Sequence, residues 1–258
     1  MSVGEKMLLR WTDTISPEFD CSDAVGLLCV GSCEQHSDYL PVGTDTLIGT
    51  RVSEEAARRA QARVYLLPVQ TCGFSPHHRS FKGCITISQD SLLRYLVELC
   101  LCAFGNGIGT LIIVNSHGGN QSCLQNVVNE LGAKHGHKAI LVRYWDLIAS
   151  EVSALRDSPE GGMGHAGEFE TSLMMYLHPE LVRPERFGER QPAIGSAYFS
   201  PDLFASNMVY SYVPFEAYSP LGNVGQPQFG SAAKGEMFFT LACESLARMI
   251  DHYARDPY

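Results

Sequence analysis

The chain has 258 residues, of which 45% are hydrophobic and 18% charged, and its formal net charge is −9. This composition is that of a globular protein with a sizeable core, and the length suits one domain over residues 1–258. The acidic balance and the lack of long basic runs argue against a nucleic-acid partner. No segment approaches the roughly 18 uninterrupted apolar residues of a membrane helix, and the N-terminus has no signal-peptide core. We therefore expect a soluble, cytoplasmic protein that does not bind membranes.

The nine cysteines are odd in number and include no C-x-x-C pair. Several lie in apolar runs, as Cys29 and Cys100 do, which favours buried free thiols in a reducing compartment. A nucleophilic role for Cys33 is the less favoured alternative.

Strand-like and helix-like segments alternate through the first half of the chain. Continuous apolar runs, typical of strands covered on both faces, occupy residues 24–31, 63–69, 110–114 and 138–144. Apolar residues at helical spacing occupy 46–62, 88–104 and 121–135, with Ser88 placed to cap the second helix. This alternation predicts an α/β fold, a mainly parallel sheet with helices on both faces.

The rhythm changes in the second half. Residues 187–230 are rich in Pro, Gly, Ser and aromatic residues, and we interpret them as a long ordered excursion because dense aromatics tend to pack. Local core is the favoured role for those aromatics, with pocket walls or subunit contacts as alternatives. A closing helix is predicted over 232–253.

The first candidate site follows the first predicted strand. Glu34 and His36 lie two residues apart, and Asp45 follows in the same loop. In an extended segment, side chains two apart point the same way, so Glu34 and His36 can reach one metal cluster. A solvated loop pair is an equally good interpretation of those two, and Asp45 taken alone better suits the first turn of the next helix.

A second candidate, His117, lies directly after residues 110–114 in the sequence NSHGGN. In open parallel sheets, ligand sites form beyond the carboxyl ends of strands, where neighbouring loops converge. Gly118 and Gly119 allow close approach of a ligand to the backbone, so we expect both to contact substrate. A plain turn is the alternative, whereas a phosphate loop is disfavoured because its Lys and Ser/Thr are missing.

The third candidate lies in the glycine-rich segment 161–172, which contains His165, Glu168 and Glu170. A helix is predicted to begin near Ala166. Side chains two apart on a helix face about 200° away from each other, so only one glutamate can point into a site. Spacing alone does not separate that role from ordinary acidic enrichment of a first turn.

Together these side chains suit a metal site. Glu, Asp and His without Cys favour Zn²⁺, Mn²⁺ or Fe²⁺. Two ions about 3.5–4 Å apart need a bridging group, which a carboxylate such as Asp45 can supply. Such ions lower the pKa of a bound water and polarise a carbonyl oxygen, and an unligated histidine can then carry protons to the leaving nitrogen.

The motifs resemble those of the creatininase (creatinine amidohydrolase) family. The matching pieces, in the family's order, are EQHSDYLPVGTD (34–45), VNSHGGN (114–120), RYWDL (143–147), HAGEFETSLMMYLHPELV (165–182) and SAAKGE (231–236). The resemblance implies a three-layer α/β/α sandwich with a mainly parallel central sheet. It also implies two divalent metal ions, a small-molecule substrate and a homo-oligomer, commonly a hexamer.

The resemblance also implies roles for single residues. The positions that match metal ligands are Glu34, His36, Asp45, His117 and Glu170, with Asp45 as the bridge. His165 matches the histidine proposed as proton donor, and Trp145 matches an aromatic substrate position. His78, in the loop GFSPHHRSFKG, is a further candidate substrate contact, although a solvated loop is equally compatible with it.

The chain departs from creatininase proper at two places. Creatininase carries Tyr and Glu where this chain has Gly118 and Gly119, and that Glu is a metal ligand there. It also carries a substrate-packing Trp where this chain has Gly161. These differences argue against creatinine as substrate. The H-G-G-N form resembles other branches: formamide deformylases, a peptide-maturing enzyme of redox-cofactor synthesis and hydrolases of oxidised inositols.

The sequence therefore predicts a two-metal hydrolase that cleaves a small cyclic or linear amide C–N bond with metal-activated water. Hydrolysis of a C–C bond in a cyclic diketone or inosose is one alternative, because the same ions would polarise a ketone. A non-catalytic metal-binding scaffold is the other.

Overall fold

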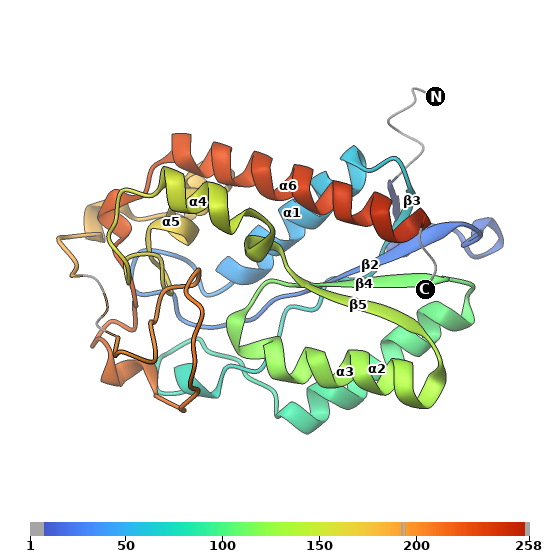
Figure 1. Ribbon diagram of the computed structural model, residues 1–258, viewed down its shortest axis with the longest axis horizontal. Helices are drawn as coiled ribbons and strands as arrows, with labels where there is room; N and C mark the ends of the chain where they lie inside the picture. Colours follow the sequence, from blue (N-terminus) through green and yellow to red (C-terminus); the bar gives the residue numbers. More distant parts are fainter. Residues whose placement is uncertain (1–7, 192, 194, 256–258) are drawn as a thin grey trace.

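A sheet of five parallel strands, in the order β1-β3-β2-β4-β5, forms the centre of the molecule (Figure 1). The computed structural model describes residues 8–255 except 192 and 194. The strands are β1 (Leu8–Arg10), β2 (Ala24–Val30), β3 (Arg63–Leu66), β4 (Thr110–Asn115) and β5 (Lys138–Arg143). Every residue of β2 is buried, as expected for a strand covered on both faces.

Helices cover both faces of the sheet and complete a three-layer α/β/α sandwich (Figure 1). One face packs against α1 (Thr44–Arg59), α5 (Glu168–Leu177) and α6 (Ala232–Arg255), and the other against α2 (Gln89–Gly105) and α3 (Gln121–His135). Side chains of a strand alternate between the faces, so Leu27 belongs to the first core and Leu28 to the second. The predicted fold class is confirmed.

The strand order places the first two candidate loops side by side. From β2 the chain passes to β3 on one side and later returns to β4 on the other side of β2. Val30, the last residue of β2, pairs with Asn115, the last residue of β4. The loops beyond these strand ends therefore meet at a switch point of the sheet, where α/β proteins commonly bind ligands.

Most predicted elements lie within a few residues of the observed ones. Ser88 caps α2 as predicted, because its hydroxyl accepts a hydrogen bond from the Ser91 amide. One difference has a local cause, and two short elements were missed. Ala166 has a left-handed φ of 53°, so α5 begins at Glu168 rather than near Ala166. The three-residue strand β1 and the short helix α4 (Ala149–Leu155) were not predicted.

The described residues of the 187–230 segment form loops with short 3₁₀ turns, drawn in orange in Figure 1 at one end of the sheet. Backbone hydrogen bonds tie the segment to the glycine-rich loop before α5. The Val224 amide donates to the His165 carbonyl at 2.8 Å, and the Gln226 amide donates to that of Gly162 at 2.9 Å. Among the helices of the described residues, none is long and apolar enough to cross a membrane.

Candidate metal centre

Glu34, His36 and His117 meet beyond the carboxyl ends of β2 and β4. All three side chains are almost fully buried, with exposed fractions of 1%, 0% and 5%. Oε2 of Glu34 lies 3.2 Å from Nε2 of His117, so the two loops are in direct contact. Glu34 and His36 are therefore not a solvated loop pair, which was the alternative interpretation of those two residues from sequence.

Asp45, in the first turn of α1, lies between the two imidazoles. Its Oδ1 is 3.2 Å from Nε2 of His36, and its Oδ2 is 3.1 Å from Nδ1 of His117. Oδ2 is buried and makes no hydrogen bond to any described residue, although the imidazole nitrogen is close. The helix itself receives no side-chain capping bond at Gly43, so Asp45 is not its N-cap.

Of the two glutamates at the start of α5, only Glu170 faces this cluster. Its Oε2 is 3.9 Å from Nε2 of His36 and accepts a hydrogen bond from the Ala166 amide at 2.6 Å. Glu168 points elsewhere, where it accepts bonds from the Ser158 amide and the Lys234 ammonium group. The expectation that only one of the pair reaches the site agrees with this geometry.

Three imidazoles each turn one nitrogen toward a backbone carbonyl oxygen. The pairs are His36 Nδ1 and Glu34 at 3.2 Å, His117 Nε2 and Phe74 at 3.3 Å, and His165 Nε2 and Gln35 at 2.6 Å. A carbonyl only accepts hydrogen bonds, so in a neutral ring these nitrogens carry the hydrogen. The opposite nitrogens present lone pairs to carboxylate oxygens, the arrangement that fixes metal-binding histidines.

Charges in the metal-free cluster are strongly coupled. Burial opposes ionisation of His36, but the carboxylates of Asp45 and Glu170 outweigh it and raise the pKa of His36 to about 9. Burial raises the pKa of Glu170 to about 7. Against burial, Glu34 holds the pKa of His117 well above its usual range. Protons thus supply the positive charge that the buried carboxylates require.

The donor set fits two cations that share one carboxylate. Ligand atoms of Glu34, Asp45 and His117 all lie within 4.8 Å of one another, and so do those of His36, Asp45 and Glu170. Asp45 belongs to both groups and offers a different oxygen to each. Oxygen and imidazole donors without thiolate suit Zn²⁺, Mn²⁺ or Fe²⁺. The residues therefore fit a two-metal site. At its centre lies Oδ2 of Asp45, which has no hydrogen-bond partner among the described residues.

His165 lies beside these groups and faces Glu34 rather than Asp45. Its Nδ1 is 3.5 Å from Oε1 of Glu34, and its ring centroid is 4.2 Å from that of His36. Burial and the neighbouring His36 hold the pKa of His165 well below its usual range. The ring is therefore neutral near pH 7, with Nδ1 free to accept a proton.

The two glycines after His117 differ from each other. A Cβ at Gly119 would lie 2.6 Å from the Phe74 carbonyl oxygen and closer still to Nε2 of His117. A Cβ at Gly118 would meet nothing within 4 Å. Gly119 is thus required for the packing of His117, whereas Gly118 borders open space; substrate contact by either stays a prediction.

The other two predicted substrate residues, His78 and Trp145, are both buried but have different neighbours. His78 is fully buried beside Glu34. Trp145 belongs to the hydrophobic core, where its ring packs edge-on against Tyr144 at 5.1 Å. No recorded contact of Trp145 within the described residues reaches the carboxylate cluster, and its substrate role stays a prediction.

Cys33 is partly buried next to Glu34, and burial raises the pKa of its thiol, which disfavours the thiolate nucleophile.

Several side chains at the site were not singled out from sequence. Gln35 is buried between two ligand residues and contacts both His78 and His165. Phe215, from the 187–230 segment, packs its ring on His78 and His165 at 4.2 and 5.1 Å. The position of Gln35 between Glu34 and His36 was the available signal, whereas nothing in the sequence connected Phe215 with the first loop.

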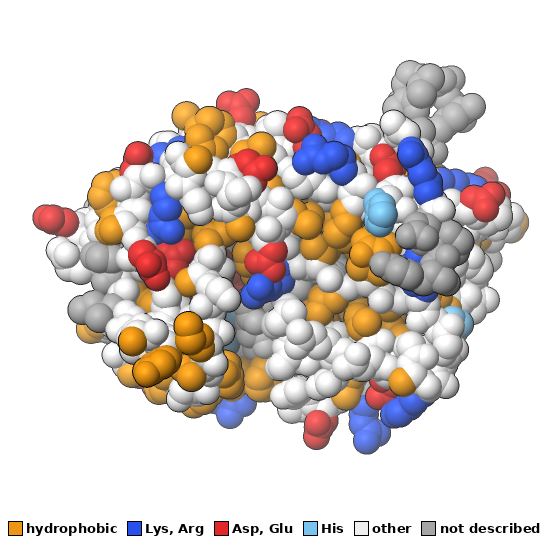
Figure 2. All heavy atoms as spheres, in the orientation of Figure 1, with side chains coloured by type: hydrophobic (Ala, Val, Ile, Leu, Met, Phe, Trp, Pro, Cys, Tyr) orange, Lys and Arg blue, Asp and Glu red, His pale blue; other side chains and the backbone are white. Residues whose placement is uncertain are grey.

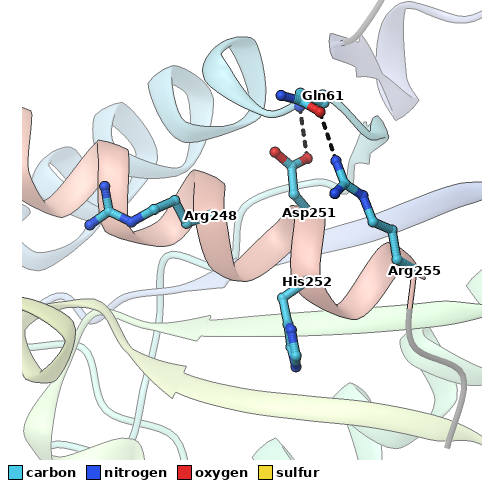
Figure 3. A pocket seen from close by; sticks show the side chains of 5 residues that line it. All are labelled: Gln61, Arg248, Asp251, His252 and Arg255. Atoms are coloured by element: carbon cyan, nitrogen blue, oxygen red, sulfur yellow. Dashed lines mark hydrogen bonds between the residues drawn. The ribbon is translucent and has the colours of Figure 1, made fainter.

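A surface hollow elsewhere is lined by Gln61, Arg248, Asp251, His252 and Arg255 (Figure 3). Gln61 lies just before β3, at the amino end of the strands, so this hollow is at the opposite end of the sheet from the cluster. Asp251 accepts hydrogen bonds from the Gln61 and Ala62 amides, and Arg255 donates to Gln61. These side chains are used in structural contacts.

A buried set of carboxylates and imidazoles at the switch point of a parallel sheet is suited to binding divalent metal ions. The family model described as creatinine amidohydrolase matches residues 9–250, and the chain belongs to this family. It is 31% identical to a mycofactocin precursor peptide peptidase of Mycobacterium ulcerans, over 90% of this chain and 86% of that protein. It is 25% identical to a creatinine amidohydrolase of Pseudomonas putida, over 88% and 89%.

Solved structures agree with this placement. A crystal structure of creatinine amidohydrolase superposes with a TM-score of 0.82 at 24% identity, covering 96% of this chain and 98% of that one. The family resemblance is therefore confirmed, and with it the creatininase-like fold. Members of the family are metal-dependent amidohydrolases, and this chain is an enzyme of that class.

Proposed function

We propose that this chain hydrolyses the C–N bond of a small cyclic or linear amide with two divalent ions bridged by Asp45. The observation that carries the proposal is the position of the Asp45 carboxylate, whose two oxygens each lie within 3.2 Å of a different imidazole nitrogen. Glu34 and His117 would hold one ion, and His36 and Glu170 the other. Zn²⁺, Mn²⁺ and Fe²⁺ are the candidate ions.

Bound ions of this kind lower the pKa of a water molecule toward neutrality and polarise a carbonyl oxygen. The protein's part is to hold its donors in place and to move a proton. Nε2 of His165 is fixed on the Gln35 carbonyl, so Nδ1 is the nitrogen available for proton transfer. We propose that Nδ1 takes a proton and gives it to the leaving nitrogen, because a neutral imidazole can do both.

The substrate is proposed to differ from creatinine. The position that carries a ligand Glu in creatininase is Gly119 here, where no side chain fits without moving the Phe74 carbonyl. At Gly161, where creatininase has a substrate-packing Trp, the backbone of Ala193 occupies the space that a side chain would need. The peptidase name of a relative supports a peptide-like amide as one candidate.

A substrate panel tests the proposal. The purified protein, loaded separately with Mn²⁺, Zn²⁺ or Fe²⁺, is offered short peptides, formamides, lactams, creatinine and inososes, and amine release is measured. Amine release that requires metal and His165 is the expected result. Acid formation from an inosose without amine release would support C–C cleavage instead, and metal binding without turnover of any class would support a scaffold.

We also propose that the protein is a cytoplasmic homo-oligomer, as the family resemblance implies. Hydrophobic side chains gather over the 187–230 segment in Figure 2, and Met208 and Tyr210 are 79% and 90% exposed. Such a patch suits a contact between subunits. All nine cysteines, which lie within the described residues, are free thiols, as suits a reducing compartment. Light scattering coupled to gel filtration would measure the assembly, with a hexamer expected.

A further inference from the structure

His78 contacts the metal-ligand candidate Glu34 from the side opposite His117. Its ring is fully buried, and its Nε2 lies 3.2 Å from Oε1 of Glu34. The other oxygen, Oε2, faces His117 and accepts a hydrogen bond from the Ser32 hydroxyl at 3.1 Å. Nε2 of His78 has no aligned hydrogen-bond partner among the described residues. Imidazoles therefore flank both oxygens of Glu34, with His117 at Oε2, and with His78 and, at 3.5 Å, His165 at Oε1.

Gln35 determines which nitrogen of His78 carries the hydrogen. The Gln35 Oε1 accepts from the Ser37 amide at 2.6 Å, so the amide orientation is fixed. Its Nε2 donates to the Gly222 carbonyl at 2.9 Å and lies 2.8 Å from Nδ1 of His78. An amide nitrogen only donates, so Nδ1 of His78 is the acceptor and Nε2 carries the hydrogen.

The direction of the lone pair separates His78 from the other three imidazoles. In their neutral forms, His36, His117 and His165 have an N–H on a carbonyl acceptor, which leaves a lone pair facing Asp45 or Glu34. The lone pair of His78 faces the Gln35 amide instead, and the nitrogen that carries its hydrogen lies 3.2 Å from Oε1 of Glu34. A nitrogen that carries a hydrogen cannot bind a metal, although His78 and Glu34 are close enough to belong to one ligand group.

We propose that His78 is a positioning residue: the hydrogen on its Nε2, which lies 3.2 Å from Oε1 of Glu34, attracts that carboxylate and so orients it toward the ion shared with Asp45 and His117. Gln35 sets the tautomer that makes this possible. The ring is held by packing, because Phe215 and His165 lie at centroid distances of 4.2 and 4.5 Å. Outer hydrogen bonds of this kind typically contribute 10–100-fold to metal affinity.

The inference rests on the proposed two-metal site and predicts an effect on one ion only. His78→Leu removes the donor next to Glu34, whereas His36 and Glu170 at the other position are unchanged. His78→Gln keeps an amide N–H near the place of Nε2. We therefore expect His78→Leu to weaken one of two binding events by about 10–100-fold, and His78→Gln to restore affinity to within a few-fold of wild type.

Calorimetric titration of chelator-stripped protein with Mn²⁺ tests this, with bound metal counted by elemental analysis and folding checked by circular dichroism. Two ions on wild type, one strong ion on folded His78→Leu, and two on His78→Gln support the inference. Equal loss in both variants would mean that His78 is itself a ligand, and equal retention in both would mean that it has no role in binding; either result overturns the inference. A wild type that binds no ion would instead contradict the proposed function.

Discussion

At the scale of single residues, the roles proposed for the histidines follow from which carboxylate each one faces. His36 and His117 have their outer nitrogens on carbonyls and their inner nitrogens on Asp45. His165 is anchored in the same way but is directed at Oε1 of Glu34 and contacts neither Asp45 nor Glu170 in the recorded ion pairs of the described residues. His165 is close enough to Glu34 and His36 to form a ligand group with them, but it has no contact with the proposed bridge, so we propose it as the proton carrier.

Replacement of His165 should therefore separate metal binding from turnover. His165→Ala is expected to retain both ions and the native fold but to lose about 10²–10⁴-fold in kcat, the usual effect of removing a general acid or base. Metal analysis and steady-state kinetics on the best amide of the panel measure the two effects. His135→Ala, at an exposed position at the end of α3, is the control. Loss of metal in His165→Ala would show that His165 is a ligand.

Gly119 and Gly118 offer a matched pair of substitutions. Gly119→Ala forces the new methyl group against the Phe74 carbonyl and the His117 ring, so His117 must shift from its position beside Asp45. We expect metal affinity to fall by about 10-fold or more, a shift in one ligand being comparable to the loss of an outer contact. Gly118→Ala, which meets open space, should bind metal like wild type. Equal affinities in the two variants would contradict this packing role.

Much of the candidate site could be predicted at this scale. Glu34, His36 and His117 follow buried strands, and strand ends converge in a parallel sheet. Asp45 could be named as a possible bridge from ligand chemistry, but its position in a first turn also has an ordinary explanation, and the family resemblance was needed to favour the bridging role. Gln35 was missed because alternation in an extended segment places it on the side opposite Glu34 and His36.

At the scale of elements, the loop before α5 depends on the 187–230 segment. Asp202, which is 4% exposed, accepts hydrogen bonds from the Gly161 and Met163 amides and pairs with Arg156 at 2.8 Å. This one carboxylate therefore fixes the loop that leads to His165. Strands β2 to β5 were predictable from continuous apolar runs and the long helices from their periodicity. These contacts were not, because no periodic pattern links segments so far apart.

Asp202→Ala should consequently destabilise the protein. Two buried amides and one guanidinium group lose their acceptor, so the free energy of unfolding is expected to fall by about 3 kcal/mol. Urea denaturation followed by fluorescence measures the change. Glu180→Ala, at a side chain that is 65% exposed, should change stability by less than about 0.5 kcal/mol. A similar small effect for Asp202→Ala would show that the loop is held by other contacts.

At the scale of the whole molecule, stability of the metal-free protein should fall between pH 7 and pH 9. His36 has a pKa of about 9 in the fold, against about 6.5 in an unfolded chain. The protonated His36 imidazole therefore contributes its full stabilisation below pH 6.5, and this contribution is lost as the pH rises through 9. The pKa of His165 is lowered, and that of His77 is lowered to about 3, so both titrate below this window.

The predicted loss from His36 is about 2 kcal/mol over this range. Bound ions would replace the protons, so the metal-loaded protein should show a much smaller fall. Thermal unfolding of the stripped and loaded forms at pH 7, 8 and 9 provides the comparison. A metal-free protein whose stability stays constant or increases toward pH 9 would contradict the charge coupling described for the cluster.

The account depends most directly on Asp45 as the group shared by two ions. Elemental analysis of wild type and Asp45→Ala, after equilibration with Mn²⁺ or Zn²⁺ and removal of free metal, tests it in one measurement. Two ions per wild-type chain and none on the folded variant are predicted, because the two groups proposed to hold the ions both contain Asp45. Retention of both ions by Asp45→Ala would contradict the bridged two-metal site.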